Sequence, residues 1–308
     1  MTFKQVFTKK ILAWILICLL TLSVQDTAET PSPVDVELNI ESPTRENICS
    51  FLARRFVEIK PGIGCLLESP RVEFNVCYTS TNFLAEYVLR NICGYVDQAN
   101  KLRAFLEYYK TDFYDYTQLL LHRDIEFPFK ATCHETVGVV QVGDKEIRIK
   151  HVVATNDTMT DYYEYSNLLA LKAIYHAKRG ELREARVELN RLERLFDGKG
   201  FADKAFEHRR KELGRDVYEV YKIALAIIAY RYIGEEKEVE KYTRILQDIK
   251  PIATYYTPDL KGDGDLNVES ASLIAIALYG EIRSTRSEEQ SWSLLLVIVL
   301  IILLVSVV

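Results

Sequence analysis

The sequence lacks the short motifs that mark the commonest zinc, nucleotide and serine-hydrolase sites. It contains no Cys-x-x-Cys pair, so no zinc pattern is present. The patterns GxxxxGK(S/T), GxGxxG and GxSxG are also absent, which leaves nucleotide binding and serine hydrolysis without support. Basic residues are not in excess, because 39 Lys and Arg stand against 44 Asp and Glu, for a net charge of −5. We therefore expect no nucleic-acid partner.

Two apolar segments lie at opposite ends of an otherwise polar chain of 308 residues. Residues 11–24 follow Lys9 and Lys10 and are typical of a secretory signal peptide or signal anchor, which we assign to residues 1–28. Residues 292–308 carry no charge and are long enough to span a membrane. We expect a C-terminal transmembrane anchor and a domain on the extracytoplasmic side of the cell membrane. A cytosolic domain with a tail anchor and a lipid-anchor attachment signal are the alternatives.

Between these segments, the composition separates a linker from a domain. Residues 29–47 are rich in Thr, Ser, Pro and acidic residues, which is typical of a stalk. Residues 48–287 contain five cysteines, and an exported compartment permits disulfides. An odd number leaves at least one cysteine unpaired within the monomer. The pairing stays open among Cys49, Cys65, Cys77, Cys93 and Cys133.

An internal repeat dominates the domain. Residues 161–175 match residues 216–230 at an Asp, two Tyr and a Glu, and both segments are followed by a glycine. A segment with apolar residues in steps of three and four comes next in each case. Similar apolar segments precede Gly94 and Gly280. The pattern predicts buried inner helices that end at left-handed glycines, each paired with an outer helix that faces water.

One stretch has a different period. Residues 136–155 alternate Val and Ile with polar residues around Gly143 and Asp144. This alternation predicts a β-hairpin with a two-residue turn. We expect the hairpin to lie over one end of the helical layers.

The inner helix, glycine turn and outer helix resemble the α/α-toroid class, which includes six-hairpin glycosidase-like and terpenoid-cyclase-like domains. Residues 264–278 are similar to the start of an inner helix in such toroids, and residues 195–206 look like a loop that crosses the rim. The resemblance covers residues 78–282. It implies a mainly α, two-layer, toroid-like domain, although four helix-pair junctions are fewer than a closed ring of six hairpins needs.

The starts of the predicted inner helices supply the candidate site residues, because these helix ends line the cavity mouth in a toroid. Glycoside hydrolysis needs two carboxyl groups, one protonated and one ionised. Tyrosine rings can stack on sugars. The predicted catalytic acids are Glu269, Asp203 and Asp161, and the predicted substrate-binding residues are Tyr163 and Tyr218.

A structural interpretation competes with the catalytic one. Asp161 and Glu164 have the spacing of a capping box, and Asp216 and Glu219 repeat it. Each aspartate would then accept hydrogen bonds from free amides and oppose the positive end of the helix dipole. Repetition at equivalent positions favours capping for Asp161 and Asp216.

Residues 259–270 resemble a calcium loop of the EF-hand or dockerin type. The candidate ligands are Asp259, Asp263 and Asp265. However, Lys261 occupies a ligand position, and Ser270 replaces the bidentate acid at the last position. A solvated turn that leads into a capped helix explains the segment better, so we expect no cofactor.

These observations favour a membrane-anchored extracellular domain that binds or hydrolyses glycans. The alternative is a non-catalytic helical-repeat module that binds a protein on the membrane surface, because concave helical surfaces bind peptides without chemistry. Whether the chain is an enzyme stays open at this point. A catalytic domain requires a deep pocket with two carboxyl groups, whereas a binding module requires an open groove.

Overall fold

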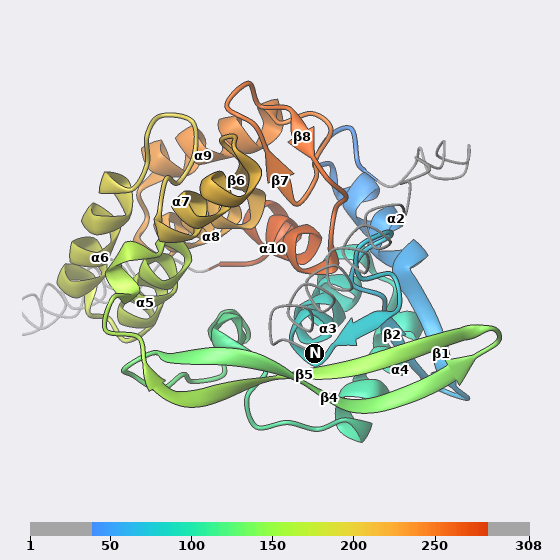
Figure 1. Ribbon diagram of the computed structural model, residues 1–308. Coiled ribbons are helices and arrows are strands. Elements are labelled where there is room, and N and C mark those ends of the chain that lie inside the picture. The colour runs from blue at the N-terminus through green and yellow to red at the C-terminus, as the bar shows by residue number, and fades with distance from the viewer. Residues whose placement is uncertain (1–38, 283–308) are drawn as a thin grey trace, which may run out of the picture. The chain divides into compact units, whose positions relative to one another are not determined.

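The structure is a computed structural model that describes residues 39–282 (Figure 1). The expected signal segment, most of the stalk and the expected C-terminal anchor lie outside these residues. Within residues 39–282, no helix combines the length and the hydrophobicity needed to cross a membrane. Neither the expected transmembrane helix nor the signal peptide is therefore seen in the described part of the chain.

Four largely buried helices surround the interior. Helix α3 packs against α10, α10 against α8, and α8 against α5, while the 3-10 helix η3 contacts both α5 and α3. The α5, α8 and α10 sequences are apolar over most of their surface, so burial removes their side chains from water. Helix α3 also buries the polar residues 79–82 in its first turn. The bounds are α3 (Thr79–Tyr87), η3 (Tyr116–Leu121), α5 (Ser166–Lys178), α8 (Val220–Ile233) and α10 (Val268–Tyr279).

Outer helices cover three of these elements. Helix α4 (Val96–Tyr108) packs on α3, α6 (Leu182–Arg194) on α5, and α9 (Glu236–Asp248) on α8. Each buries a single stripe and leaves its charged face in water. The remaining helical segments are α2 (Arg45–Arg55), the π-helical η2 (Val88–Cys93), the 3-10 turn η4 (Tyr162–Glu164) and α7 (Lys204–Leu213).

The prediction of a two-layer helical toroid is wrong, because three small sheets are part of the fold. The largest contains a long hairpin, β4 (Lys130–Val142) and β5 (Lys145–Thr158), and the short strand β3 (Val76–Tyr78) pairs in parallel with β5. In Figure 1 this hairpin runs along one side of the helices. The other sheets are β1 (Phe56–Lys60) with β2 (Ile63–Leu66), and β6 (Tyr218–Glu219), β7 (Tyr255–Tyr256) and β8 (Gly262–Asp263).

The glycines that end the helices are required for different physical reasons. Gly94 and Gly234 end η2 and α8 with φ of 76° and 73°, in the left-handed region that favours glycine. Gly280 ends α10 with φ of −70°, so the prediction of a left-handed glycine is wrong there. A Cβ atom at Gly280 would lie 2.6 Å from the carbonyl oxygen of Ile276, so close approach is what excludes a side chain.

Two disulfides join segments that come early in the domain. Cys49–Cys93 links α2 to η2, and Cys65–Cys77 links β2 to β3. Cys133 lies exposed on β4 and is the free cysteine among the described residues.

Replacing Cys49 and Cys93 with serine is expected to lower the free energy of unfolding by about 2–4 kcal/mol. This disulfide spans 44 residues and Cys65–Cys77 spans 12, so the longer crosslink constrains the unfolded chain more. Urea unfolding of the oxidised wild type and of each Cys-to-Ser pair measures both losses. A larger loss for the Cys65 and Cys77 pair would contradict this explanation.

Candidate functional site

A polar pocket of about 240 Å³ lies where the N-terminal ends of three inner helices meet η3 and the base of the long hairpin. The second residues of α5, α8 and α10, which are Asn167, Tyr221 and Glu269, all line it. Asp115 reaches it from the position just before η3. The other lining residues are Tyr116, Thr117, Lys130, Thr132, Met159, Tyr165, Leu168, Leu171 and Leu225.

Local capping positions Glu269 in the pocket wall. The Asn267 side chain caps α10 by accepting a hydrogen bond of 2.9 Å from the Ser270 amide. This fixes the start of the helix, so that Glu269 falls in the first turn on the side of the cavity. Among residues 39–282, no hydrogen bond reaches the Glu269 carboxyl group, which is therefore available to a ligand.

The surroundings of Glu269 favour its protonated form. Burial raises the pKa of Glu269 well above its usual range, and the nearby charges of Asp115, Glu68, Glu219 and Glu73 raise it further. A raised pKa increases the fraction of this carboxyl group that is protonated near neutral pH. The protonated group can donate its proton to a bound molecule.

Asp115 differs from Glu269 in protonation state. Burial raises the pKa of Asp115 to about 6, and the backbone amides of Tyr116 and Thr117 limit this rise by stabilising the carboxylate. At pH 7 Asp115 is therefore mostly ionised. The pocket thus presents one carboxyl group whose protonated form is favoured and one that is mostly ionised, the arrangement that separates a general acid from a base or nucleophile.

Neutral polar groups and aliphatic side chains complete the lining. Burial raises the pKa of the Tyr221 hydroxyl well above its usual range, so it stays a hydrogen-bond donor. Within the described residues, neither this hydroxyl nor the Asn167 amide has a side-chain hydrogen-bond partner. Lys130 is the only basic residue among the lining residues, and its Nζ donates to Thr158 Oγ1 at 2.7 Å and to the Asn156 carbonyl at 3.2 Å.

A buried ion pair supports the helix starts behind the pocket. Asp203, which is 1 % exposed, caps α7 and accepts hydrogen bonds from the Ser166 amide at 2.9 Å and hydroxyl at 2.6 Å. The Lys222 Nζ lies 2.7 Å from Asp203 Oδ2 and 2.6 Å from Glu219 Oε2. Burial opposes the ionisation of Asp203, but Lys222 and Ser166 outweigh it, so its pKa is lowered. These contacts join the starts of α5, α7 and α8.

The structure brings one predicted catalytic acid, Glu269, to the pocket and distributes the others elsewhere. Asp203 forms the buried ion pair and does not line the cavity. Asp161 pairs with Lys204 at the surface. Tyr163 is 51 % exposed, whereas the Tyr218 hydroxyl donates to Asp197 at 2.6 Å and its ring stacks on Phe206. Neither tyrosine lines the pocket.

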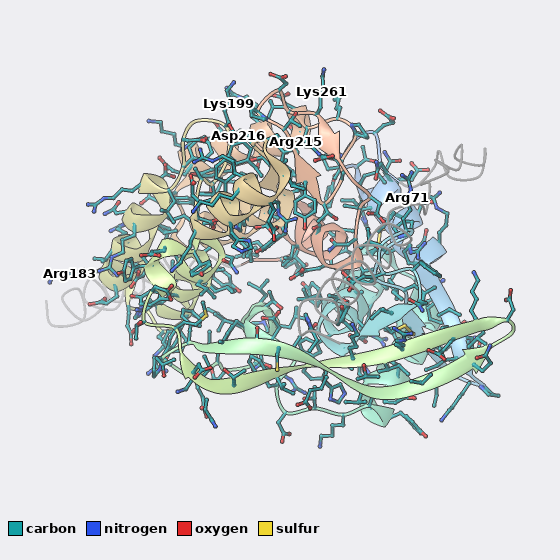
Figure 2. All side chains as sticks on the ribbon, viewed as in Figure 1. Arg71, Arg183, Lys199, Arg215, Asp216 and Lys261 are labelled. Carbon is teal, nitrogen blue, oxygen red and sulfur yellow. A yellow bond between two sulfur atoms is a disulfide. The ribbon has the colours of Figure 1, made fainter. Side chains whose placement is uncertain are left out.

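The capping interpretation of the repeated aspartates is also wrong. Asp161 precedes η4 without a side-chain cap bond, and helix α8 begins after Glu219, three residues past Asp216. Figure 2 shows Asp216 next to Arg215, and Asp216 is exposed. The side chains that do cap helices here include Asp203 and Asn267.

The calcium candidates do not converge. Asp263 forms an ion pair with Arg215 at 2.7 Å, and Asp265 accepts a hydrogen bond of 3.0 Å from the Arg71 amide. Asp259 is exposed. Across residues 39–282, no group of three or more His, Cys, Asp or Glu side chains is arranged to hold a metal ion.

Asp115, Tyr221 and Asn167 were not predicted from the sequence. The repeat aligned Asp161 with Asp216, which matches Asn167 to Lys222 and hides the equivalence of Asn167 and Tyr221. A signal for Asp115 was present, because an aspartate just before Tyr-Thr-Gln-Leu-Leu is typical of a helix start.

Comparison with known proteins assigns no family and no function to this pocket. No family model matches the chain, and neither a curated protein nor a solved structure matches it. The functional argument therefore depends on the pocket and its residues.

Proposed function

We propose that this pocket binds one sugar unit of a glycan and cleaves its glycosidic bond with Glu269 and Asp115. The observation that carries this proposal is that Glu269 and Asp115 line one cavity in different environments, with the pKa of Glu269 raised well above its usual range and that of Asp115 to about 6. Glycoside hydrolysis requires such a pair. In such sites, the two carboxyl groups lie in different environments, and this difference makes one the acid and the other the base.

The size and lining of the pocket support a small hydroxylated ligand. Its volume of about 240 Å³ is below the ~300–1,000 Å³ of sites for drug-sized ligands. The Asn167 amide and the Tyr221 and Thr132 hydroxyls can bond sugar hydroxyl groups, while Leu168 and Leu225 offer apolar contact to a ring face.

The reaction follows from the two protonation states. Glu269 donates its proton to the glycosidic oxygen as the bond to the anomeric carbon breaks, so the leaving sugar departs as a neutral alcohol. The Asp115 carboxylate either takes a proton from the attacking water or attacks the anomeric carbon itself. In the second case, water then cleaves the glycosyl ester, with the Glu269 carboxylate accepting its proton.

The two disulfides support the extracytoplasmic location that forms part of this proposal. Cys49–Cys93 and Cys65–Cys77 both lie in the domain that carries the pocket. Disulfides form and persist in oxidising compartments and are rare in the cytosol of most cells. Glycans exposed outside the cell are then the accessible substrates.

A screen of glycans tests this function directly. The oxidised protein is incubated with a panel of oligosaccharides and polysaccharides, and new reducing ends are measured. Binding of the same panel is followed by calorimetry. Cleavage of at least one glycan is the expected result. The absence of both cleavage and binding across the panel would overturn the proposal and favour the non-catalytic protein-binding module. Binding without cleavage would overturn the hydrolase and leave a glycan-binding domain.

A further inference from the structure

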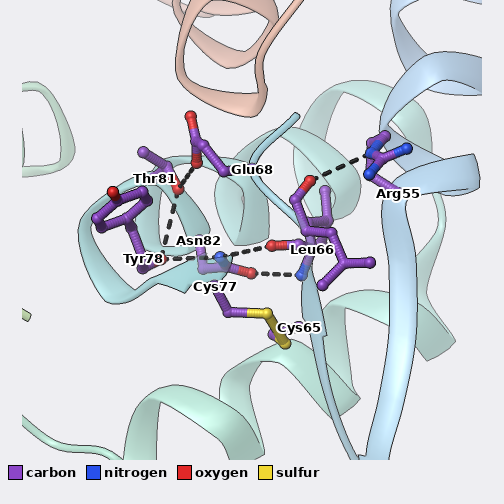
Figure 3. The surroundings of a disulfide bond; sticks show 9 residues. Arg55, Cys65, Leu66, Glu68, Cys77, Tyr78, Thr81 and Asn82 are labelled. Carbon is purple, nitrogen blue, oxygen red and sulfur yellow. Dashed lines mark hydrogen bonds between the residues drawn. A yellow bond between two sulfur atoms is a disulfide. The ribbon is translucent and has the colours of Figure 1, made fainter. Parts of the chain in front are cut away.

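Glu68 is a buried acid that the proposed chemistry does not use. It lies on the loop between β2 and β3, is 3 % exposed, and points toward the start of α10 (Figure 3). The Cys65–Cys77 disulfide closes this loop at its two ends. Glu68 is therefore held on a covalently braced segment directly beside the helix that carries Glu269.

The contacts of Glu68 fasten this loop to two helices. The Thr81 hydroxyl on α3 donates to Glu68 Oε2 at 2.6 Å, and the Glu269 amide donates to Glu68 Oε1 at 3.4 Å. The Val268 amide donates to the Glu68 backbone carbonyl at 2.9 Å. Both the main chain and the side chain of Glu68 thus bond the first amides of α10, which otherwise have no partner within the helix.

The strand before Glu68 is held equally firmly. Asn82 accepts a hydrogen bond from the Leu66 amide at 2.7 Å and donates to the Leu66 carbonyl at 3.1 Å. Arg55 donates to the Leu67 carbonyl at 3.2 Å and to the Ser69 carbonyl at 2.8 Å. Because these bonds bracket Glu68 on both sides, its carboxyl group has little freedom to move away from α10.

Charged groups from several elements act on Glu68 and Glu269. Burial raises the pKa of Glu68 to about 7, and the Glu73 charge adds to this, while Thr81, the Glu269 amide and Arg55 oppose it. Glu269 in turn feels the negative charges of Asp115, Glu68, Glu219 and Glu73. Near neutral pH, Glu68 therefore carries a partial negative charge beside Glu269.

We propose that Glu68 is a positioning residue for Glu269: it anchors the first turn of α10 through the Val268 and Glu269 amides and places its carboxylate beside the Glu269 residue. This inference deepens the proposed function, because it concerns the acid of the same site. A purely structural role for Glu68 would affect folding but would leave the protonation of Glu269 unchanged, and this difference can be measured.

The test is a titration of Glu269 in the unliganded, oxidised protein. Carboxyl carbons of ¹³C-labelled glutamate are followed by NMR between pH 4 and 9, and the Glu269 signal is assigned by its loss in Glu269→Gln. In Glu68→Gln, which keeps the acceptor for the Glu269 amide, the acid dissociation constant of Glu269 should rise on the order of three- to tenfold. An unchanged titration in a folded variant would overturn the inference.

Two further variants sharpen this test. Thr81→Val removes the donor to Glu68 and keeps the side-chain shape, so Glu68 protonates more readily and Glu269 should shift in the same direction by less. Glu146→Gln, on the exposed turn end of the hairpin, should leave the Glu269 titration unchanged. A shift of equal size in Glu146→Gln would show a general charge effect and overturn the specific role of Glu68.

If the Cys65–Cys77 disulfide acts on Glu269 through Glu68, the effects of removing the disulfide and of replacing Glu68 on the Glu269 titration should not add. Cys65→Ser with Cys77→Ser should shift the Glu269 titration in the same direction as Glu68→Gln, because the loop is no longer closed. The combination with Glu68→Gln should produce no larger shift than Glu68→Gln alone. Fully additive shifts would show that the disulfide and Glu68 act on Glu269 independently, and would contradict a disulfide effect that depends on Glu68.

Stability provides a second measurement in case a titration signal is lost. The raised pKa means that folded Glu68 keeps a proton that the unfolded chain releases between about pH 4.5 and pH 7. The contribution of Glu68 is therefore present below this window and lost as the pH rises through it. Glu68→Gln lacks this loss, so its melting temperature relative to wild type should be higher at pH 8 than at pH 4. The opposite trend would overturn the inference.

These measurements separate this inference from the proposed function. The titration uses no substrate, so a Glu269 shift without any glycan cleavage would support the positioning role and reject the glycosidase. Cleavage that depends on Glu269, with a titration insensitive to Glu68, would support the glycosidase and reject the positioning role.

Discussion

Replacing Glu269 with glutamine is expected to slow glycoside cleavage by about 10²–10⁴-fold, because the reaction loses its general acid. Glutamine has nearly the same size and places an amide in the same cavity, so ligand binding should change little. The loss should appear in kcat for natural glycosides, whose leaving alcohols require protonation. It should be much smaller for aryl glycosides such as dinitrophenyl sugars, whose leaving groups depart as stable anions.

Asp115→Asn provides the matched comparison. The Asp115 charge is needed for attack on the anomeric carbon, so the activated leaving group should not rescue this variant. Removing that charge also lowers the pKa of Glu269, since Asp115 is one of the charges that raise it. The alkaline limb of any residual rate profile should therefore move to lower pH. Equal rescue of both variants by dinitrophenyl sugars would contradict the assigned roles.

Asp203→Asn is expected to lower the free energy of unfolding by about 3–5 kcal/mol, because it leaves the buried Lys222 with less compensating charge. Lys222 Nζ keeps only the contact to Glu219, and the bonds from Ser166 weaken as well. Urea unfolding followed by circular dichroism measures this loss. The control is Asp161→Asn, which breaks the surface pair with Lys204 and should change the free energy of unfolding far less than Asp203→Asn.

The same variant also tests the sequence prediction that Asp203 is catalytic. If Asp203→Asn abolished glycan cleavage while the protein kept its stability, Asp203 would act in the reaction and not in the buried ion pair. Loss of stability together with a proportional loss of folded, active protein is the result that the structure leads us to expect.

Helices were easier to predict than strands, for a physical reason. The helix α8 is apolar over most of its surface and ends at Gly234, so its burial is visible in a short window of sequence. The hairpin of β4 and β5 was predicted from its alternating pattern, although its strands are longer than expected. Strand β3, by contrast, contains only three residues and pairs in parallel with distant β5. Such pairing depends on tertiary contacts, which leave no local period in the sequence.

The site was predictable only in part. Glu269 was predicted because it lies at the start of an apolar helix, a position that a short window of sequence reveals. Asp115 enters the pocket because η3 lies between α3 and α5, which is a consequence of packing. Asp203 resembled a catalytic acid in the sequence, and only the positions of Ser166 and Lys222 identify it as the centre of a buried ion pair.

The position of α10 in the chain has a consequence for biosynthesis. This helix is the last of the described elements to leave the ribosome, yet it packs against α2, α3 and α8 and contributes Glu269. During translation, the earlier helices can pack against one another before α10 is present to complete the interior. A nascent chain released before residue 268 would therefore expose apolar faces of α3 and α8 and would be a target for quality control, so only complete synthesis creates the pocket.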